Sequence, residues 1–153
     1  MSSRNGRWMV PGLVLIGLAD AVYLSVLHWQ GEVPPCGGYG GCAQVNTSPF
    51  AETFGVPIAA MGAGLYAMML AVSLARLRLK GADFAYATLV LYSLALAGAL
   101  FVSYLTGLEA LVIKAFCYWC LVLAGVTFLL LGLAARDVWV IGSRTARYRV
   151  TRA

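Results

Sequence analysis

The chain of 153 residues is 61% hydrophobic and only 11% charged, and its net charge is +5. Soluble domains carry about 25% charged residues, so this composition excludes a water-soluble globular protein. The apolar residues form long runs with the charged residues between them. This pattern indicates that lipid surrounds most of the folded chain.

Four apolar runs are long enough to cross a bilayer, which takes about 20 helical residues. They cover residues 10–29, 56–75, 84–105 and 115–135. Backbone groups find no water in lipid, and a β-barrel would show short alternating segments, so each run is predicted to be helical. We therefore expect an all-α integral membrane protein, a four-transmembrane-helix bundle that forms a single domain over residues 1–153.

The first run follows Arg4 and Arg7, as the apolar part of a signal peptide would. It is longer than a typical signal-peptide core, and no small-residue cleavage site follows it. We expect it to be retained as a membrane anchor.

The basic residues predict the orientation of the bundle. They gather before the first run, between the second and third runs, and after the fourth, and Lys114 is the exception. No Lys or Arg lies between Trp8 and Ala75, so the positive-inside rule puts the connection with Glu32 and Glu52 outside. This predicts a multi-pass protein of the cell inner (plasma) membrane with both termini cytoplasmic. The basic tail 144–152 is expected to bind anionic membrane lipid, and no nucleic acid.

The first outer connection also carries a helix signal. Thr47-Ser48-Pro49 is typical of a helix start, with Ser48 as the amino cap and Pro49 at the first helical position. A short interfacial helix to about Phe54 would place Phe50 and Phe54 on one face, as a flap on the membrane surface.

All four cysteines fall at the predicted outer face. Cys36 and Cys42 lie in the first outer connection, and Cys117 and Cys120 lie in the first turns of the fourth run. An even set of cysteines in an exported compartment indicates disulfide chemistry.

The two cysteine pairs differ in their surroundings. Cys36 and Cys42 enclose a glycine-rich stretch, residues 37–41, whose backbone is free to take many conformations. Cys117-Tyr-Trp-Cys120 is predicted at a helix amino terminus, where free amides and the helix dipole favour a reactive thiolate. A mobile dithiol beside a fixed, reactive one is suited to a two-step exchange relay. The sequence shows no nucleotide-binding or haem-binding motif, so we expect a lipid-soluble quinone, ubiquinone or menaquinone, to exchange electrons with the membrane-embedded pair.

Two other interpretations of the cysteines stay open. They could form static disulfides that brace the bundle, although a CxxC bridge closes too small a loop to constrain much. They could also form a Cys₄ zinc site, which the expected exported location disfavours, so no metal is predicted.

Three single residues have competing interpretations. Lys114 is expected to snorkel to the interface, with stabilisation of a Cys117 thiolate as the alternative. Asp20, in the middle of the first run, is expected to hydrogen-bond to a facing Tyr or Ser, with proton movement as the alternative. His28, the only histidine, is expected to be interfacial.

Several motifs together resemble a known family. They are the loop pair Cys36 and Cys42, Ser48-Pro49-Phe50, Phe54-Gly55-Val56-Pro57, Phe116-Cys117-Tyr118-Trp119-Cys120, and the run from Gly17 to Leu24 in the first span. Over residues 10–135 the chain resembles the bacterial homologues of vitamin K epoxide reductase. Disulfide-forming membrane oxidases have the CxxC pair in the first outer loop, and here the order is reversed.

The resemblance implies a quinone site near the outer face and a role for each cysteine. It implies that Cys36 exchanges with a thioredoxin-like partner, that Cys42 passes electrons to Cys117, and that Cys120 faces the quinone. Ser48 and Phe54 are expected to lie at the quinone site as well.

Two departures from the family pattern bear on function. The chain lacks the thioredoxin-like domain that some bacterial members carry, so a separate exported partner is expected. Leu121-Val122-Leu123 follows Cys120 where the animal enzymes have Thr-Tyr-Ala, which puts anticoagulant sensitivity and epoxide chemistry in doubt.

The expected function is thiol oxidation by a quinone, in support of disulfide formation outside the cytoplasm. Two alternatives stay open: a quinone or quinone-epoxide reductase that serves quinone recycling, and a non-catalytic membrane subunit braced by disulfides.

Overall fold

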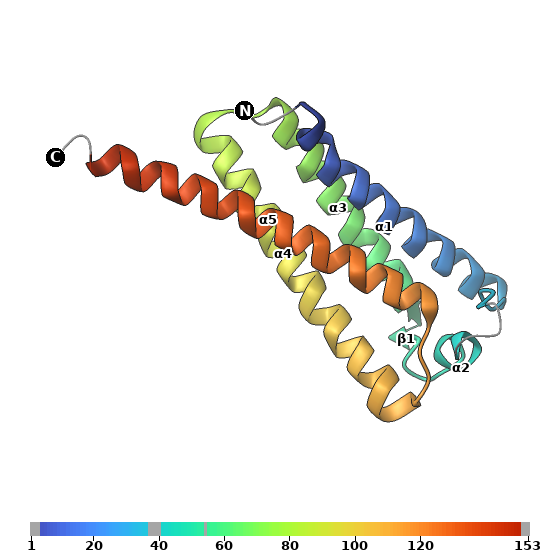
Figure 1. Cartoon of the computed structure of the whole chain (residues 1–153). Helices are drawn as coiled ribbons and strands as arrows, with labels where there is room; N and C mark the ends of the chain where they lie inside the picture. The colour runs from blue at the N-terminus through green and yellow to red at the C-terminus, as the bar shows by residue number, and fades with distance from the viewer. Residues whose placement is uncertain (1–3, 37–40, 54, 151–153) are drawn as a thin grey trace.

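The computed structural model describes residues 4–36, 41–53 and 55–150. Four long helices dominate it (Figure 1): α1 (Arg4–Gln30), α3 (Ile58–Arg78), α4 (Gly81–Leu108) and α5 (Tyr118–Val150). Each contains a stretch that is long and apolar enough to cross a membrane. The predicted all-α bundle of four transmembrane helices is confirmed.

The four helices form a closed square in cross-section, because α1 and α4 each pack against both α3 and α5. Every helix contributes a side chain to the central core, namely Val14, Tyr66, Leu91 and Leu130. The outward faces carry large exposed apolar side chains, which suits a surface in contact with lipid. The helices are therefore apolar both inside and outside the bundle.

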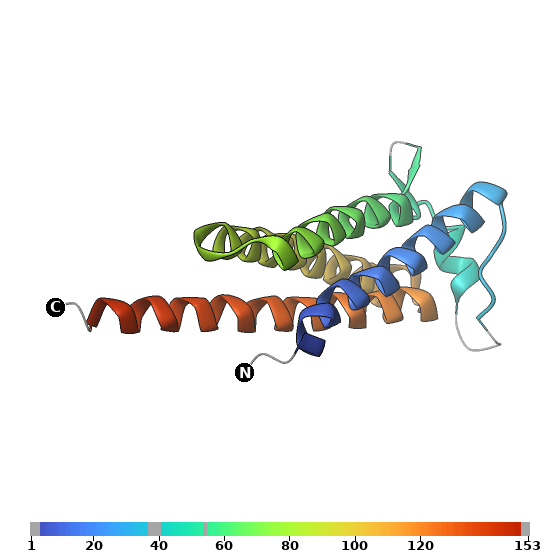
Figure 2. The same cartoon turned by 90° about the horizontal axis from the view of Figure 1, so that it is seen from above.

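The two ends of the bundle differ. The start of α1 and the connection between α3 and α4 lie together at one end, where α5 runs past the other helices (Figure 2). Here Arg76 connects α3 to both α5 and α4. Its Nη2 lies 2.6 Å from Asp137 Oδ2 of α5, and its guanidinium covers the Phe84 ring of α4. The α5 helix continues to Val150, beyond the predicted span end at residue 135.

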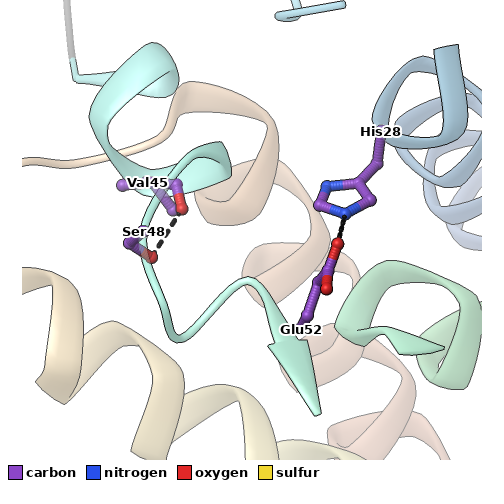
Figure 3. Close-up of polar contacts among 4 residues, drawn as sticks. All are labelled: His28, Val45, Ser48 and Glu52. Atoms are coloured by element: carbon purple, nitrogen blue, oxygen red, sulfur yellow. Dashed lines mark hydrogen bonds and ion pairs between the residues drawn. The ribbon is translucent and has the colours of Figure 1, made fainter. Parts of the chain in front are cut away.

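The opposite end holds a short helix, α2 (Cys42–Asn46), and two antiparallel strands, β1 (Glu52–Thr53) and β2 (Val56–Pro57). The outer connection thus contains a short helix, but the predicted position of that helix is wrong. It ends before Ser48, whose hydroxyl donates a 2.8 Å hydrogen bond back to the Val45 carbonyl (Figure 3). Pairing of β1 with β2 then holds the next residues extended, and Phe54 lies outside the described residues.

The junction between α4 and α5 closes the same end. After Leu108 the chain widens into a π-helical turn, η1 (Glu109–Ile113), and Lys114 then reverses it with a left-handed backbone (φ 55°). The Ala115 N–H donates to the Glu109 carbonyl at 3.1 Å. Helix α5 begins at Tyr118, so Cys117 lies immediately before the helix and Cys120 in its first turn.

Candidate active site

The two cysteine pairs are in different redox states in this structure. Cys36 and Cys42 form a disulfide with their Cα atoms 6.2 Å apart, whereas Cys117 and Cys120 are free thiols. Cys42 and Cys117 are both buried, with 1% and 0% of their surface exposed. One cysteine of each pair is thereby kept away from water.

The outer connection is bound to the α4–α5 junction directly beside the cysteines. The Gly41 N–H donates a 3.0 Å hydrogen bond to the Phe116 carbonyl, so the residue before Cys42 is paired with the residue before Cys117. The approach is close enough that a Cβ atom on Gly41 would collide with the Ala115 methyl group. Glycine is required here for contact between the two segments.

A second hydrogen bond connects the same two segments. The Trp119 indole N–H, within the CxxC segment, donates to the carbonyl of Pro35 at 3.2 Å. Pro35 precedes Cys36, and the indole ring also packs against Tyr23 of α1, with the ring centroids 5.3 Å apart. Both cysteines of the loop pair are thus preceded by a residue that hydrogen-bonds to the segment containing the other pair.

The start of α5 favours a thiolate at Cys117. The Cys117 carbonyl accepts the Leu121 N–H at 3.0 Å, as expected at a helix amino terminus. A hydrogen bond from the Cys120 thiol lowers the pKa of Cys117. Lys114 is exposed, as expected of an interfacial residue.

Glu109 is a functional candidate that the sequence analysis missed. It is only 3% exposed, and its Oε2 accepts the backbone N–H of Cys117 at 3.2 Å. The carboxylate also lies within hydrogen-bonding reach of the Cys120 thiol. The available signal was an acidic residue eight positions before Cys117 inside an apolar stretch.

A largely apolar cavity opens beside the CxxC pair, with side chains from α1, the outer connection, α3, α4, η1 and α5 in its walls. Its volume is about 130 Å³. The polar side chains among its walls are His28, Asn46, Ser48, Tyr66, Thr106, Glu109, Cys120 and Thr127. Apolar walls with a few convergent polar groups are typical of small-molecule sites.

Cys120, Ser48 and Phe54 are the residues predicted to contact the quinone. Cys120 and Ser48 both line the cavity, whereas Phe54 lies outside the described residues. His28 also lines it, and its Nε2 lies 2.7 Å from Glu52 Oε1 (Figure 3). This hydrogen bond joins the end of α1 to β1 and so holds the hairpin against the cavity.

Asp20 differs from its expected role. Its side chain is 8% exposed, and neither carboxylate oxygen has a hydrogen-bond partner among the described residues. The expected hydrogen bond to a facing Tyr or Ser is therefore wrong, because the nearby hydroxyl of Tyr66 is bound to Thr127 Oγ1 instead, at 2.8 Å.

Within the described ranges, no group of three or more His, Cys, Asp or Glu side chains could hold a metal ion.

Comparison with known proteins agrees with this geometry. A search of curated proteins found no match to the chain. The model of the vitamin K epoxide reductase family matches residues 8–135, which include all four cysteines, the candidate membrane spans of α1, α3 and α4, and most of that of α5. The chain therefore belongs to the vitamin K epoxide reductase family and is a multi-pass membrane oxidoreductase of the quinone and disulfide type.

Proposed function

We propose that the protein oxidises the dithiol of a separate thioredoxin-like exported protein. Two electrons pass first through Cys36 and Cys42, then through Cys117 and Cys120, and finally to a quinone. The protein would thereby support disulfide formation outside the cytoplasm. Its active site would lie at the extracytoplasmic face of the inner membrane, with both termini cytoplasmic.

The observation that carries this proposal is the direct attachment of the loop pair to the CxxC segment. The Gly41–Phe116 and Trp119–Pro35 hydrogen bonds connect the segments on either side of the Cys36–Cys42 disulfide to the segment that holds Cys117. Thiol–disulfide exchange needs a thiolate to reach a disulfide sulfur, so attachment at two points favours exchange between the pairs.

The exchange begins at the loop pair. A partner thiolate attacks Cys36, forms a mixed disulfide, and releases Cys42 as a thiolate. Cys42 then attacks Cys117 in the Cys117–Cys120 disulfide and releases Cys120.

Resolution of the two mixed disulfides restores the loop pair. The second thiol of the partner attacks the partner's sulfur bound to Cys36, so the partner leaves oxidised. The freed Cys36 thiolate attacks Cys42, which re-forms the loop disulfide and leaves Cys117 and Cys120 as thiols.

The cavity supports a quinone as the electron acceptor. Its apolar walls suit a planar ring, and the Cys120 sulfur is part of the wall. A quinone, either ubiquinone or menaquinone, supplies an acceptor for two electrons and two protons. We propose Ser48 and Phe54 as further contacts to it. The Ser48 hydroxyl now donates to Val45, so donation to a quinone carbonyl would replace that bond.

Purified protein in lipid nanodiscs, supplied with a quinone and a reduced thioredoxin-like protein, tests the proposal through the absorbance change of quinol formation. Cys36→Ala should abolish activity with the protein donor and retain it with a small dithiol that reaches the CxxC pair directly. Cys120→Ala should abolish both. Equal loss of small-dithiol activity in the two variants would contradict the order of the relay, and no quinol with wild-type protein would favour a structural role for the cysteines.

A further inference from the structure

We propose that Glu109 is a catalytic residue that accepts the proton of the Cys120 thiol when the Cys117–Cys120 pair is oxidised. This inference rests on the proposed function, because it assigns a proton acceptor to the quinone-reducing step.

The backbone places Glu109 inside the bundle, although it falls between two predicted spans. Helix α4 extends to Leu108, and the π-helical turn that follows points the Glu109 side chain toward the start of α5. Such turns are rare and often occur at functional sites. Burial of a carboxylate is costly unless it has partners, so its position needs an explanation.

The partners of Glu109 belong to the CxxC segment. One carboxylate oxygen accepts the Cys117 N–H at 3.2 Å, and the Cys120 thiol lies within hydrogen-bonding reach. Glu109 and Cys120 line the same cavity. The carboxylate thus lies in the same cavity wall as a reacting sulfur of the proposed quinone site.

The other titratable groups of the cavity wall have different partners. His28 of α1 pairs with Glu52 of β1, and the Tyr66 hydroxyl of α3 bonds to Thr127 of α5. Asp20 of α1 is buried but does not line the cavity. Among the described residues that line the cavity, Glu109 is therefore the carboxylate placed to take a proton from Cys120.

Oxidation of Cys117 and Cys120 requires a proton acceptor. Oxidation of the two thiols forms one S–S bond and releases two electrons and two protons, which the quinone takes up to become a quinol. Cys120 is half-buried and lines a largely apolar cavity, so a group of the protein in that wall is the nearest acceptor for its proton. Glu109 takes this proton and passes it to the quinone oxygen, and the second proton of the quinol, which Cys117 released when it became a thiolate, is taken up from water.

Glu109→Gln separates proton acceptance from support of the backbone. Glutamine keeps the length of the side chain and an oxygen that can accept the Cys117 N–H, but it cannot take up a proton. We expect quinol formation by the pre-reduced protein to slow by about 10²- to 10⁴-fold, the usual loss for a missing general base. The matched control is Glu32→Gln, the same change at an exposed glutamate of the outer connection, which should react at the wild-type rate.

Two further measurements make the result specific. A Cys42–Cys117 mixed disulfide, trapped in a Cys36→Ser and Cys120→Ser background, should form equally well with Glu109→Gln, because this exchange does not use the base. In the reduced protein, the infrared S–H stretching band of Cys120 should shift in Glu109→Gln and not in Glu32→Gln, because a neutral amide replaces the carboxylate beside the thiol.

The outcomes distinguish this inference from the proposed function. Normal quinol formation by Glu109→Gln, or an unshifted S–H band, would overturn the role of Glu109. If wild-type protein forms no quinol, the proposed function fails, and the S–H band still decides whether the Glu109 carboxylate acts on the Cys120 thiol.

Discussion

The Trp119 indole is the side chain that bonds the segment before Cys36 to the CxxC segment. Its N–H donates to the Pro35 carbonyl at 3.2 Å, and its ring packs against Tyr23. Phenylalanine at position 119 would keep an aromatic ring there and lose only the donor. This single polar contact can therefore be tested apart from the packing.

Trp119→Phe should slow the transfer of electrons from the loop pair, Cys36 and Cys42, to Cys117 and Cys120. Loss of one hydrogen bond costs about 1 kcal/mol, so we expect roughly a fivefold decrease in rate. Acid quenching followed by maleimide labelling of the free thiols measures the redox state of each pair over time. Trp139→Phe, the same change at an indole that is 75% exposed on α5, is the matched control. Equal rates in the two variants would show that the bond to Pro35 does not support the exchange.

The residues of the site differ in how far the sequence could predict them. The four cysteines are recognisable from their number and spacing alone, without knowledge of the fold. Glu109 and Trp119 were not recognised, because their roles depend on contacts made after folding. The predicted third span ends at residue 105, which puts Glu109 in a connection, whereas α4 and the π-helical turn carry it into the bundle.

Gly41 is the point where the outer connection touches the α4–α5 junction. It leaves too little space for a side chain, since a Cβ atom would meet the Ala115 methyl group. Its φ of −86° is available to alanine, so the obstacle is the contact and not the backbone.

Gly41→Ala should push the connection away from the junction and slow reduction of Cys117 and Cys120 by a protein dithiol. Ala115→Gly in the same protein should restore the rate, because it removes the colliding methyl group. Gly107→Ala, at a helical glycine whose added Cβ would meet nothing within 4 Å, is the control. The same maleimide assay reports the result. Failure of Ala115→Gly to rescue Gly41→Ala would argue against a steric contact between these two residues.

At the level of elements, the four membrane helices were predictable and the outer connection was not. Long apolar runs in lipid fold as helices, so the structure differs from the prediction only at the helix ends, most of all at α5, which continues to Val150. Ser48 and Pro49 gave a local helix signal that tertiary contacts overrode. The Ser48 hydroxyl bonds to Val45 at the end of α2, and the pairing of β1 with β2 holds the next residues extended.

The whole molecule has one end that carries the cysteines and an opposite end that carries both ends of the described chain (Figure 1). The distribution of Lys and Arg predicts that the cysteine end faces outward. The ion pair between the buried Arg76 and the partly exposed Asp137 at the other end connects α3 to α5 and so holds that end together.

A reporter enzyme that is active only outside the cytoplasm tests this orientation. Fused after Gly40, it should be active, and fused after Lys80 or after Ala153 it should be silent, because those positions adjoin the basic residues. Equal expression of the three fusions, checked by immunoblot, is the control. An active fusion at Lys80 would reverse the proposed orientation.

The central claim is that the loop pair and the CxxC pair exchange disulfides, and a trapped intermediate tests it most directly. In the Cys36→Ser and Cys120→Ser double variant both resolving thiols are absent, so a Cys42–Cys117 disulfide should accumulate. Protease cleavage near Lys80, in the connection between α3 and α4, should then leave the two halves linked until a reductant is added. Two free thiols under oxidising conditions, with halves that separate after cleavage, would contradict the relay.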